Sequence, residues 1–208
     1  MAQKPLKHSA SHHVVRSGEG ISVDVSILPT SGGLSSQFSI NTAGLPVPDR
    51  RLSCDTVSLV RTDYLVKLLF AQKVPTGEGY LSVLVVQMSF EAASNFIHTM
   101  DQLNPGIEEL ERQGSLQRGT LTDITGKPDQ SAVVTASIVM TGYSGNDGCL
   151  DFYYISPFAI QRINMGNKLA VEPVVRVQLP TPLMVALVRA LIQLVPSLPV
   201  MINKEVTL

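Results

Sequence analysis

Two stretches of this sequence resemble each other and decide how the fold is interpreted. Thr56–Thr62 reads TVSLVRT, and Thr135–Thr141 reads TASIVMT. Further along, Val83–Met88 (VLVVQM) returns in the same order as Val174–Leu179 (VVRVQL). The offset between matching residues grows along the chain, which requires two insertions in the second copy. Both insertions fall in turn-forming segments, where a duplicated fold tolerates added residues. The sequence therefore predicts an internal duplication.

Each copy changes from strand-like to helical spacing at its end. In the first copy Ser89 is a predicted helix N-cap, and a helical stripe follows it. In the second copy Thr181 is the predicted N-cap and Pro182 fits the first helical position. We expect an α+β fold of antiparallel sheets with packed helices, in which a strand-strand-strand-helix unit repeats about a pseudo-twofold axis. The first stripe consists of Phe90, Ala93, Ile97, Met100 and Leu103.

The predicted organisation has three parts. Residues 1–20 are polar and form a flexible N-terminal tail. Residues 21–114 are the first copy with extra N-terminal strands, beginning with the alternating stretch Ile21–Leu28. Residues 115–208 are the second copy. We expect the two copies to form one compact unit.

The helix of the second copy is apolar nearly all round. Leu183–Val195 reads LMVALVRALIQLV between prolines, which is shorter than the ~20 residues that span a membrane. We therefore expect a buried helix and no membrane span. Such a helix must be covered on more than one side, by a sheet and by either the remaining copy or another subunit. The sequence thus predicts a homo-oligomer whose interface includes Leu183, Leu187, Leu191 and Leu194.

Aromatic residues gather shortly before this helix. Alternate members of the run Phe152–Tyr154 face opposite sides of a strand. One side is core; the other is either core as well or a surface for a protein partner or ligand. The predicted contact surface consists of Tyr143, Tyr153 and Phe158.

Composition excludes several classes of protein. The 208 residues are 44% apolar and 16% charged, which indicates a globular domain rather than a disordered chain. With 16 basic and 17 acidic residues there is no positive excess, so nucleic acid is not an expected partner. The N-terminus lacks the apolar run of a secretory signal. Two cysteines, Cys54 and Cys149, do not make a disulfide framework, so we expect a cytoplasmic protein with reduced thiols.

Candidate catalytic and metal-binding residues have simpler explanations. Gly126-Lys127 lacks the spacing of a phosphate loop. One hypothesis is that His98 activates Cys54 or Cys149 as a nucleophile. His98 lies off the apolar stripe of its helix, however, which indicates a solvated residue. We predict no catalytic residue, no cofactor and no metal site. The remaining histidines are His8, His12 and His13. Their spacing suits a metal only if the segment is helical, and no carboxylate accompanies them.

The strand-to-helix junctions resemble a small bacterial strand-strand-helix family of unknown function. Arg176–Pro182 (RVQLPTP), followed by the stripe Leu187, Ala190 and Leu191, carries the resemblance, and Val86–Glu91 (VQMSFE) is similar but lacks the proline. The duplication and the extra N-terminal strands depart from that family. The resemblance implies strand-to-helix turns at these positions and no particular activity.

Three functional hypotheses remain at this stage. The first is a non-enzymatic interaction or assembly protein that acts through an oligomeric apolar surface. The alternative is a small-ligand-binding or chaperone-like module with a cleft between the two copies. An enzyme would need a carboxylate cluster near His98, and no catalytic motif supports one.

Overall fold

The computed structural model describes residues 21–30, 33–40, 44–112, 119–125, 128–159 and 168–194. For residues 21–40, 102 and 168 it describes the backbone alone. The chain divides into two compact units, one of residues 1–47 with 153–173 and one of residues 48–152 with 174–208. The tail predicted over residues 1–20 lies outside the described residues.

The smaller unit contains a three-stranded sheet. Strands β1 (Ile21–Thr30) and β2 (Gly33–Ile40) pair antiparallel along their length, and β10 (Lys168–Leu169) joins the other side of β1. The predicted strand over 21–28 is confirmed and extends to Thr30. Ala159 and Leu169 form a small buried cluster in this unit.

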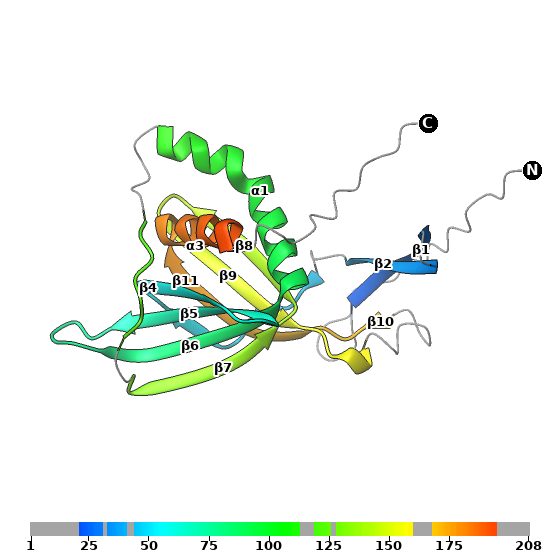
Figure 1. Ribbon diagram of the computed structural model, residues 1–208. Coiled ribbons are helices and arrows are strands. Elements are labelled where there is room, and N and C mark those ends of the chain that lie inside the picture. Colours follow the sequence, from blue (N-terminus) through cyan, green and yellow to red (C-terminus); the bar gives the residue numbers. More distant parts are fainter. Residues whose placement is uncertain are drawn as a thin grey trace, which may run out of the picture. The chain divides into compact units, whose positions relative to one another are not determined.

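The larger unit contains two four-stranded sheets (Figure 1). In the first sheet, β4 (Thr56–Arg61), β5 (Leu65–Lys73) and β6 (Tyr80–Ser89) are antiparallel neighbours. The fourth strand, β7 (Gln130–Ala136), is parallel to β6. The prediction of purely antiparallel sheets is therefore wrong. A helical crossover joins β6 to β7, and such a connection delivers the next strand in the same direction.

The second sheet has the order β3-β11-β9-β8. Strands β8 (Ile138–Ser144) and β9 (Asp147–Tyr154) form a hairpin, whose turn contains Gly145 at a φ of 59°. Strand β11 (Glu172–Pro180) follows beside β9, and β3 (Arg51–Ser53) pairs parallel with β11. Both sheets of the larger unit are thus mixed, and the protein is α+β.

The parallel strand of each sheet comes from the opposite half of the chain. Strand β7 precedes β8 in the sequence but completes the first sheet, and β3 precedes β4 but completes the second. The matching stretch at 135–141 is consequently not one strand, because β7 ends at Ala136 and β8 begins at Ile138. The larger unit nevertheless contains strand, strand, strand and helix twice, as β4-β5-β6-α1 and as β8-β9-β11-α3, although the two-residue β10 of the smaller unit lies between β9 and β11 in the chain.

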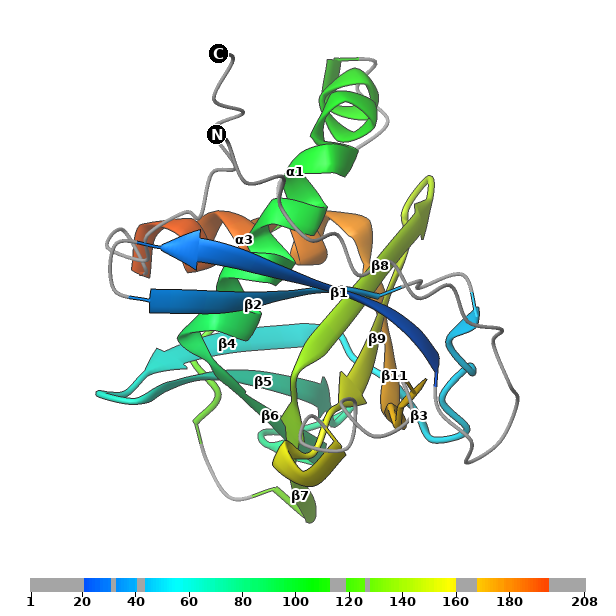
Figure 2. The same cartoon turned by 90° about the vertical axis from the view of Figure 1, so that its right-hand side faces the viewer.

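Helix α1 (Phe90–Arg112) begins where the sequence predicts. The Ser89 hydroxyl accepts the Ala92 N–H at 3.1 Å, which confirms this residue as the N-cap. The sequence predicts a break at Asn104-Pro105, but the helix continues through Pro105. Proline removes one backbone hydrogen bond without ending the helix here, and Figure 2 shows the helix changing direction in its second half.

Helix α3 (Thr181–Leu194) follows β11 directly and is covered by the first half of the chain. It packs against β4 and α1, which supply the cover that an apolar helix requires. Its start is held by Thr181, whose hydroxyl donates to the Gly145 carbonyl at 2.8 Å. This contact differs from the predicted cap, in which the hydroxyl would accept a helix N–H. At the other end, Arg61 Nη1 donates to the Leu194 carbonyl at 2.8 Å.

A single hydrophobic core joins both sheets and both helices. The rings of Phe70 in β5 and Phe152 in β9 meet at its centre, with centroids 5.7 Å apart. Among the described residues, no helix combines the length and the apolarity that crossing a membrane requires. Further fully buried members of the core are Leu68, Met88, Phe96, Ile107, Leu150, Met184, Leu187 and Leu191.

We predict that Phe152→Ala lowers the free energy of unfolding by about 3–5 kcal/mol, because it leaves a cavity where the two sheets meet. Urea denaturation monitored by circular dichroism measures the loss. The control is Phe158→Ala, since that ring is 74% exposed and its removal should cost within about 0.5 kcal/mol. Equal losses in the two variants would contradict this account of the core.

Candidate interaction surface

The outer face of the first sheet carries a row of apolar side chains. Residues in a strand alternate between faces, so Leu69 and Val85 point away from the core that their neighbours form. Leu69 is the direct cross-strand partner of Val85, and Val85 is the partner of Val133 in β7. We call Leu69, Val85 and Val133 the valine row. Leu69 and Val85 are half-buried, and Val133 at the edge of the sheet is 63% exposed.

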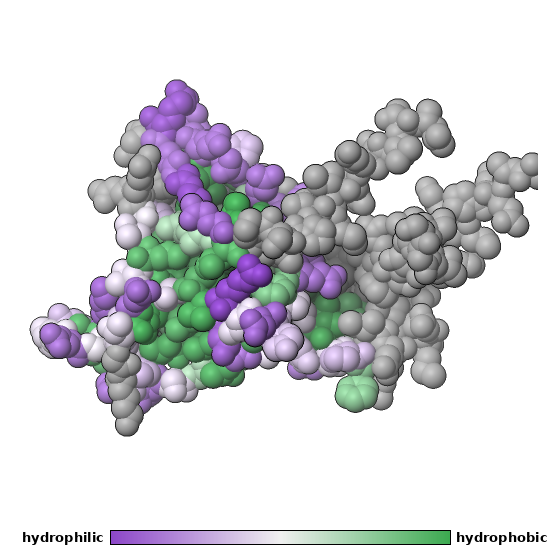
Figure 3. Space-filling model, viewed as in Figure 1, coloured by the Kyte–Doolittle hydropathy of each residue, from purple (hydrophilic) through white to green (hydrophobic). Residues whose placement is uncertain are grey.

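Further exposed apolar residues extend this face beyond the valine row. Val60 in β4 is 42% exposed and Leu81 in β6 is 39% exposed. Figure 3 shows the hydrophobic residues as a broad green area over the first sheet and the neighbouring helix α3. Exposed apolar areas are common at the contact surfaces of proteins.

One end of the same face is covered by the chain itself. Ile124 packs against a small cluster of Ala71, Tyr80 and Val83. The segment around it is fixed by hydrogen bonds, since the Thr122 N–H donates to the Val57 carbonyl at 3.2 Å. Val85 packs against the same cluster, so the segment 119–125 covers the surface next to this member of the valine row and leaves Val133 exposed.

The outer face of the second sheet is polar at the corresponding positions. Asp151 lies between two core residues of β9, and Arg176 lies between two core residues of β11. Their side chains form a two-point ion pair, with Nε to Oδ1 and Nη2 to Oδ2 both at 2.6 Å. Ser53 and Gln178 add a hydrogen bond of 3.5 Å on the same sheet. Mutual pairing satisfies these groups within the chain.

The two thiols are held in their protonated form. Burial, together with a smaller effect of the neighbouring Asp55, raises the pKa of Cys54 to about 12. Burial also raises the pKa of Cys149, Asp151 adds to the increase, and Arg176 opposes it. The Cys149 thiol donates to Asp151 Oδ1 at 4.0 Å. Because the thiolate is the reactive form, neither cysteine is an activated nucleophile at neutral pH.

The leucines predicted as an interface lie inside the chain. Leu183 is 7% exposed, and Leu187 and Leu191 are fully buried in the common core. Leu194 is half-buried against the same core. The structure therefore gives these side chains a core role, which differs from the predicted contact between subunits. The reason is that β4 and α1 already cover the helix.

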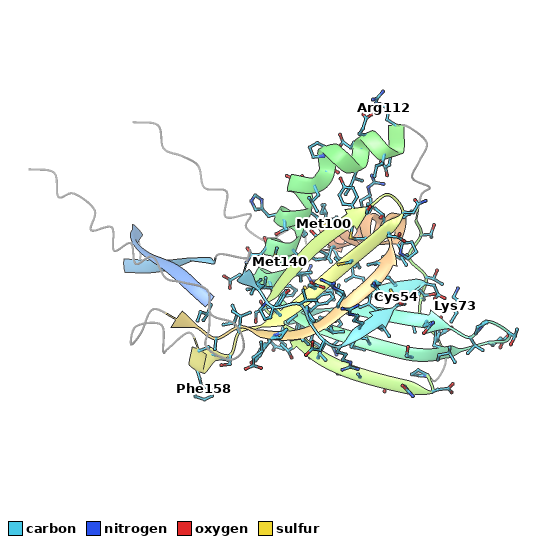
Figure 4. The ribbon with its side chains drawn as sticks, turned by 180° about the vertical axis from the view of Figure 1, so that it is seen from behind. Cys54, Lys73, Met100, Arg112, Met140 and Phe158 are labelled. Carbon is cyan, nitrogen blue, oxygen red and sulfur yellow. The ribbon has the colours of Figure 1, made fainter. Side chains whose placement is uncertain are left out.

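The predicted aromatic surface is divided in the structure. Tyr153 is 2% exposed, and Tyr143 is half-buried beside Gly106 of α1, so closely that Gly106 has no room for a side chain. Phe158 is 74% exposed in the smaller unit and points outward (Figure 4). The three residues do not form one surface.

A small cavity lies beside helix α3 in the larger unit. It has a volume of about 270 Å³ and lies between the end of α1, residues 119–121 and α3. Arg189 of α3 pairs with Glu111 of α1 at 3.0 Å beside it. Gly119 touches the Pro182 carbonyl so closely that a side chain would not fit. The cavity contains mixed polar and apolar lining residues.

The remaining sequence candidates do not assemble into a site. His98 is exposed on α1. Within the described ranges, no three His, Cys, Asp or Glu side chains gather as metal ligands would. The residues His8, His12, His13, Gly126 and Lys127 lie outside the described residues.

Comparisons with known proteins identified no relative. No family model matches the chain, and neither a curated protein nor a solved structure matches it.

We predict that Asp151→Asn speeds the alkylation of Cys149 by iodoacetamide at pH 8 by about threefold or more. Removing the carboxylate leaves Arg176 alone beside the thiol, so the pKa of Cys149 falls and the thiolate fraction grows. Arg176→Gln should slow the reaction for the opposite reason. Mass spectrometry of labelled protein over time measures both rates, with Cys149→Ser as the control for Cys54. Equal rates in the two variants would contradict the charge effect.

Proposed function

We propose that this chain is a non-enzymatic interaction protein that binds a protein partner through the outer face of its first sheet. The observation that carries the proposal is the valine row, in which half-buried Leu69 and Val85 lead to the exposed Val133 at the sheet edge. Burying a valine side chain contributes about 1.5–3 kcal/mol, so a partner seated on this row gains appreciable affinity.

The contrast between the two sheets supports the same proposal. Leu69 and Val85 occupy the places in the first sheet that Asp151 and Arg176 occupy in the second. The charged pair of the second sheet is largely buried and satisfied within the chain, whereas the apolar row of the first sheet ends at Val133 in exposed surface that a partner can remove from water.

The proposal includes an internal duplication of the strand-strand-strand-helix unit. The repeated order of elements supports it, as does the spacing of buried residues. The buried pair Leu68 and Phe70 in β5 matches the buried pair Leu150 and Phe152 in β9. Each pair is a leucine and a phenylalanine with one residue between them. Duplication followed by divergence of the two outer faces accounts for one sheet with a polar outer row and one with an apolar outer row.

A small-ligand function is the second candidate. The cavity of about 270 Å³ beside α3 favours it, because it has polar groups at its wall, among them the paired Arg189 and Glu111. This volume is slightly below that of usual small-molecule sites. Native mass spectrometry that finds a reproducible small adduct, lost in Ala186→Trp, would favour this candidate over the first.

We predict that a photo-cross-linking amino acid placed at Leu81 captures the partner in intact cells that make the protein. Leu81 is exposed on the proposed face, so the probe reaches a bound partner without disturbing the core. Adding Val85→Lys should reduce the adduct about tenfold, because it removes apolar surface from the contact. Gel electrophoresis and mass spectrometry measure the product.

The matched control places the same probe at Gln178, which is exposed on the second sheet. This position should yield no adduct of defined mass. No product at Leu81, or equal products at both positions, would contradict the proposed function.

A further inference from the structure

Strand β7 is an open edge of the first sheet. It has seven residues, and it pairs along its whole length with β6 on one side. In the described part of the chain no strand lies on its other side. An edge strand presents unpaired N–H and C=O groups that match those of another strand.

The other three sheet edges of the larger unit are protected. Strand β3 has only three residues, which is too short to be an effective template. Helix α1 packs against β8, and the Thr122 N–H binds the Val57 carbonyl beside β4. Only β7, among the described edges of these two sheets, is both long and without such cover.

The sequence of β7 lacks the devices that prevent pairing. Its residues, QSAVVTA, include no charged side chain and no proline. Natural edge strands that stay unpaired usually carry lysine, proline or a bulge. The exposed residues here are small, hydroxylated or apolar, and Val133 at the centre is 63% exposed.

We infer that β7 pairs antiparallel with β7 of a second copy of this chain, about a twofold axis at Val133. This inference goes beyond the proposed function, because pairing at the β7 edge enlarges the outer face of the first sheet and leaves it open to the proposed partner. Val133 is the middle residue of Gln130–Ala136, so a twofold pairing centred on it uses every residue of the strand. Identical strands related by a twofold axis within one sheet must run antiparallel.

The side chains fit this pairing. Val133 meets Val133 of the second copy, so the valine row continues across the interface as one apolar stripe through both sheets. Ser131 stands opposite Thr135 of the second copy, a pair whose hydroxyls bond well across strands. Because the strand is uncharged, the symmetry brings no like charges together.

Cysteine cross-linking tests both the pairing and its register. Directly opposed residues in an antiparallel pair have Cα atoms about 4.5–5.5 Å apart, within disulfide range. Val133→Cys, in a Cys149→Ser background with copper phenanthroline as oxidant, should therefore give a covalent dimer on a non-reducing gel.

The control variants differ only in register. Ser131→Cys alone should not cross-link, since its two copies lie about 13 Å apart along the strands. A mixture of Ser131→Cys with Thr135→Cys should cross-link, because these positions are opposed. Equal cross-linking of Ser131→Cys and Val133→Cys would overturn the register, and no cross-linking of Val133→Cys would overturn the pairing.

Sedimentation of the unmodified chain measures the association directly. We expect a dimer whose dissociation constant rises about tenfold or more in Val133→Lys, which opposes two like charges at the axis. The control is Val47→Lys, because Val47 is 51% exposed outside the first sheet and should leave the dimer unchanged. A monomer that still yields a different protein in the Leu81 cross-linking would overturn the dimer and leave the proposed function intact. A monomer without that product would overturn both.

Discussion

The reciprocal exchange of edge strands is the constraint on which the rest of this structure depends. Strand β7 completes the sheet of the first half, and β3 adds to the sheet of the second half. Neither half therefore has its full sheet without the other. The common core follows from this arrangement, because it brings the inner faces together so that Phe70 meets Phe152. Helix α3 is covered by β4 and α1 only because the two halves are associated in this way.

Local signals in the sequence predicted the elements better than their partners. The N-cap at Ser89 and the strand at Ile21 could be identified because capping chemistry and alternation act over a few residues. The parallel strands could not, since nothing in Gln130–Ala136 itself specifies β6 as its neighbour. The continuous helix through Pro105 was also missed, because packing around it outweighs the local preference for a break.

The surface was harder to predict than the fold. An apolar helix such as Leu183–Leu194 has the same pattern whether its own chain or a second subunit covers it. The valine row could not be predicted from the sequence, because Leu69, Val85 and Val133 become neighbours only through the register of three strands. The pairing of Asp151 with Arg176 is likewise a product of neighbouring strands. Sequence spacing carries no signal for such cross-strand rows.

The position of β3 has a consequence for the order of events during synthesis. Ser53 bonds to Gln178, which lies 125 positions later in the chain. At a translation rate of roughly 5–20 residues per second, the ribosome needs about 10 s to make that partner after Ser53 has been added. The first three long strands and α1 are complete well before then. The nascent chain thus contains β4, β5 and β6 before the partner of β3 exists, and the second sheet closes only after β11 has been made.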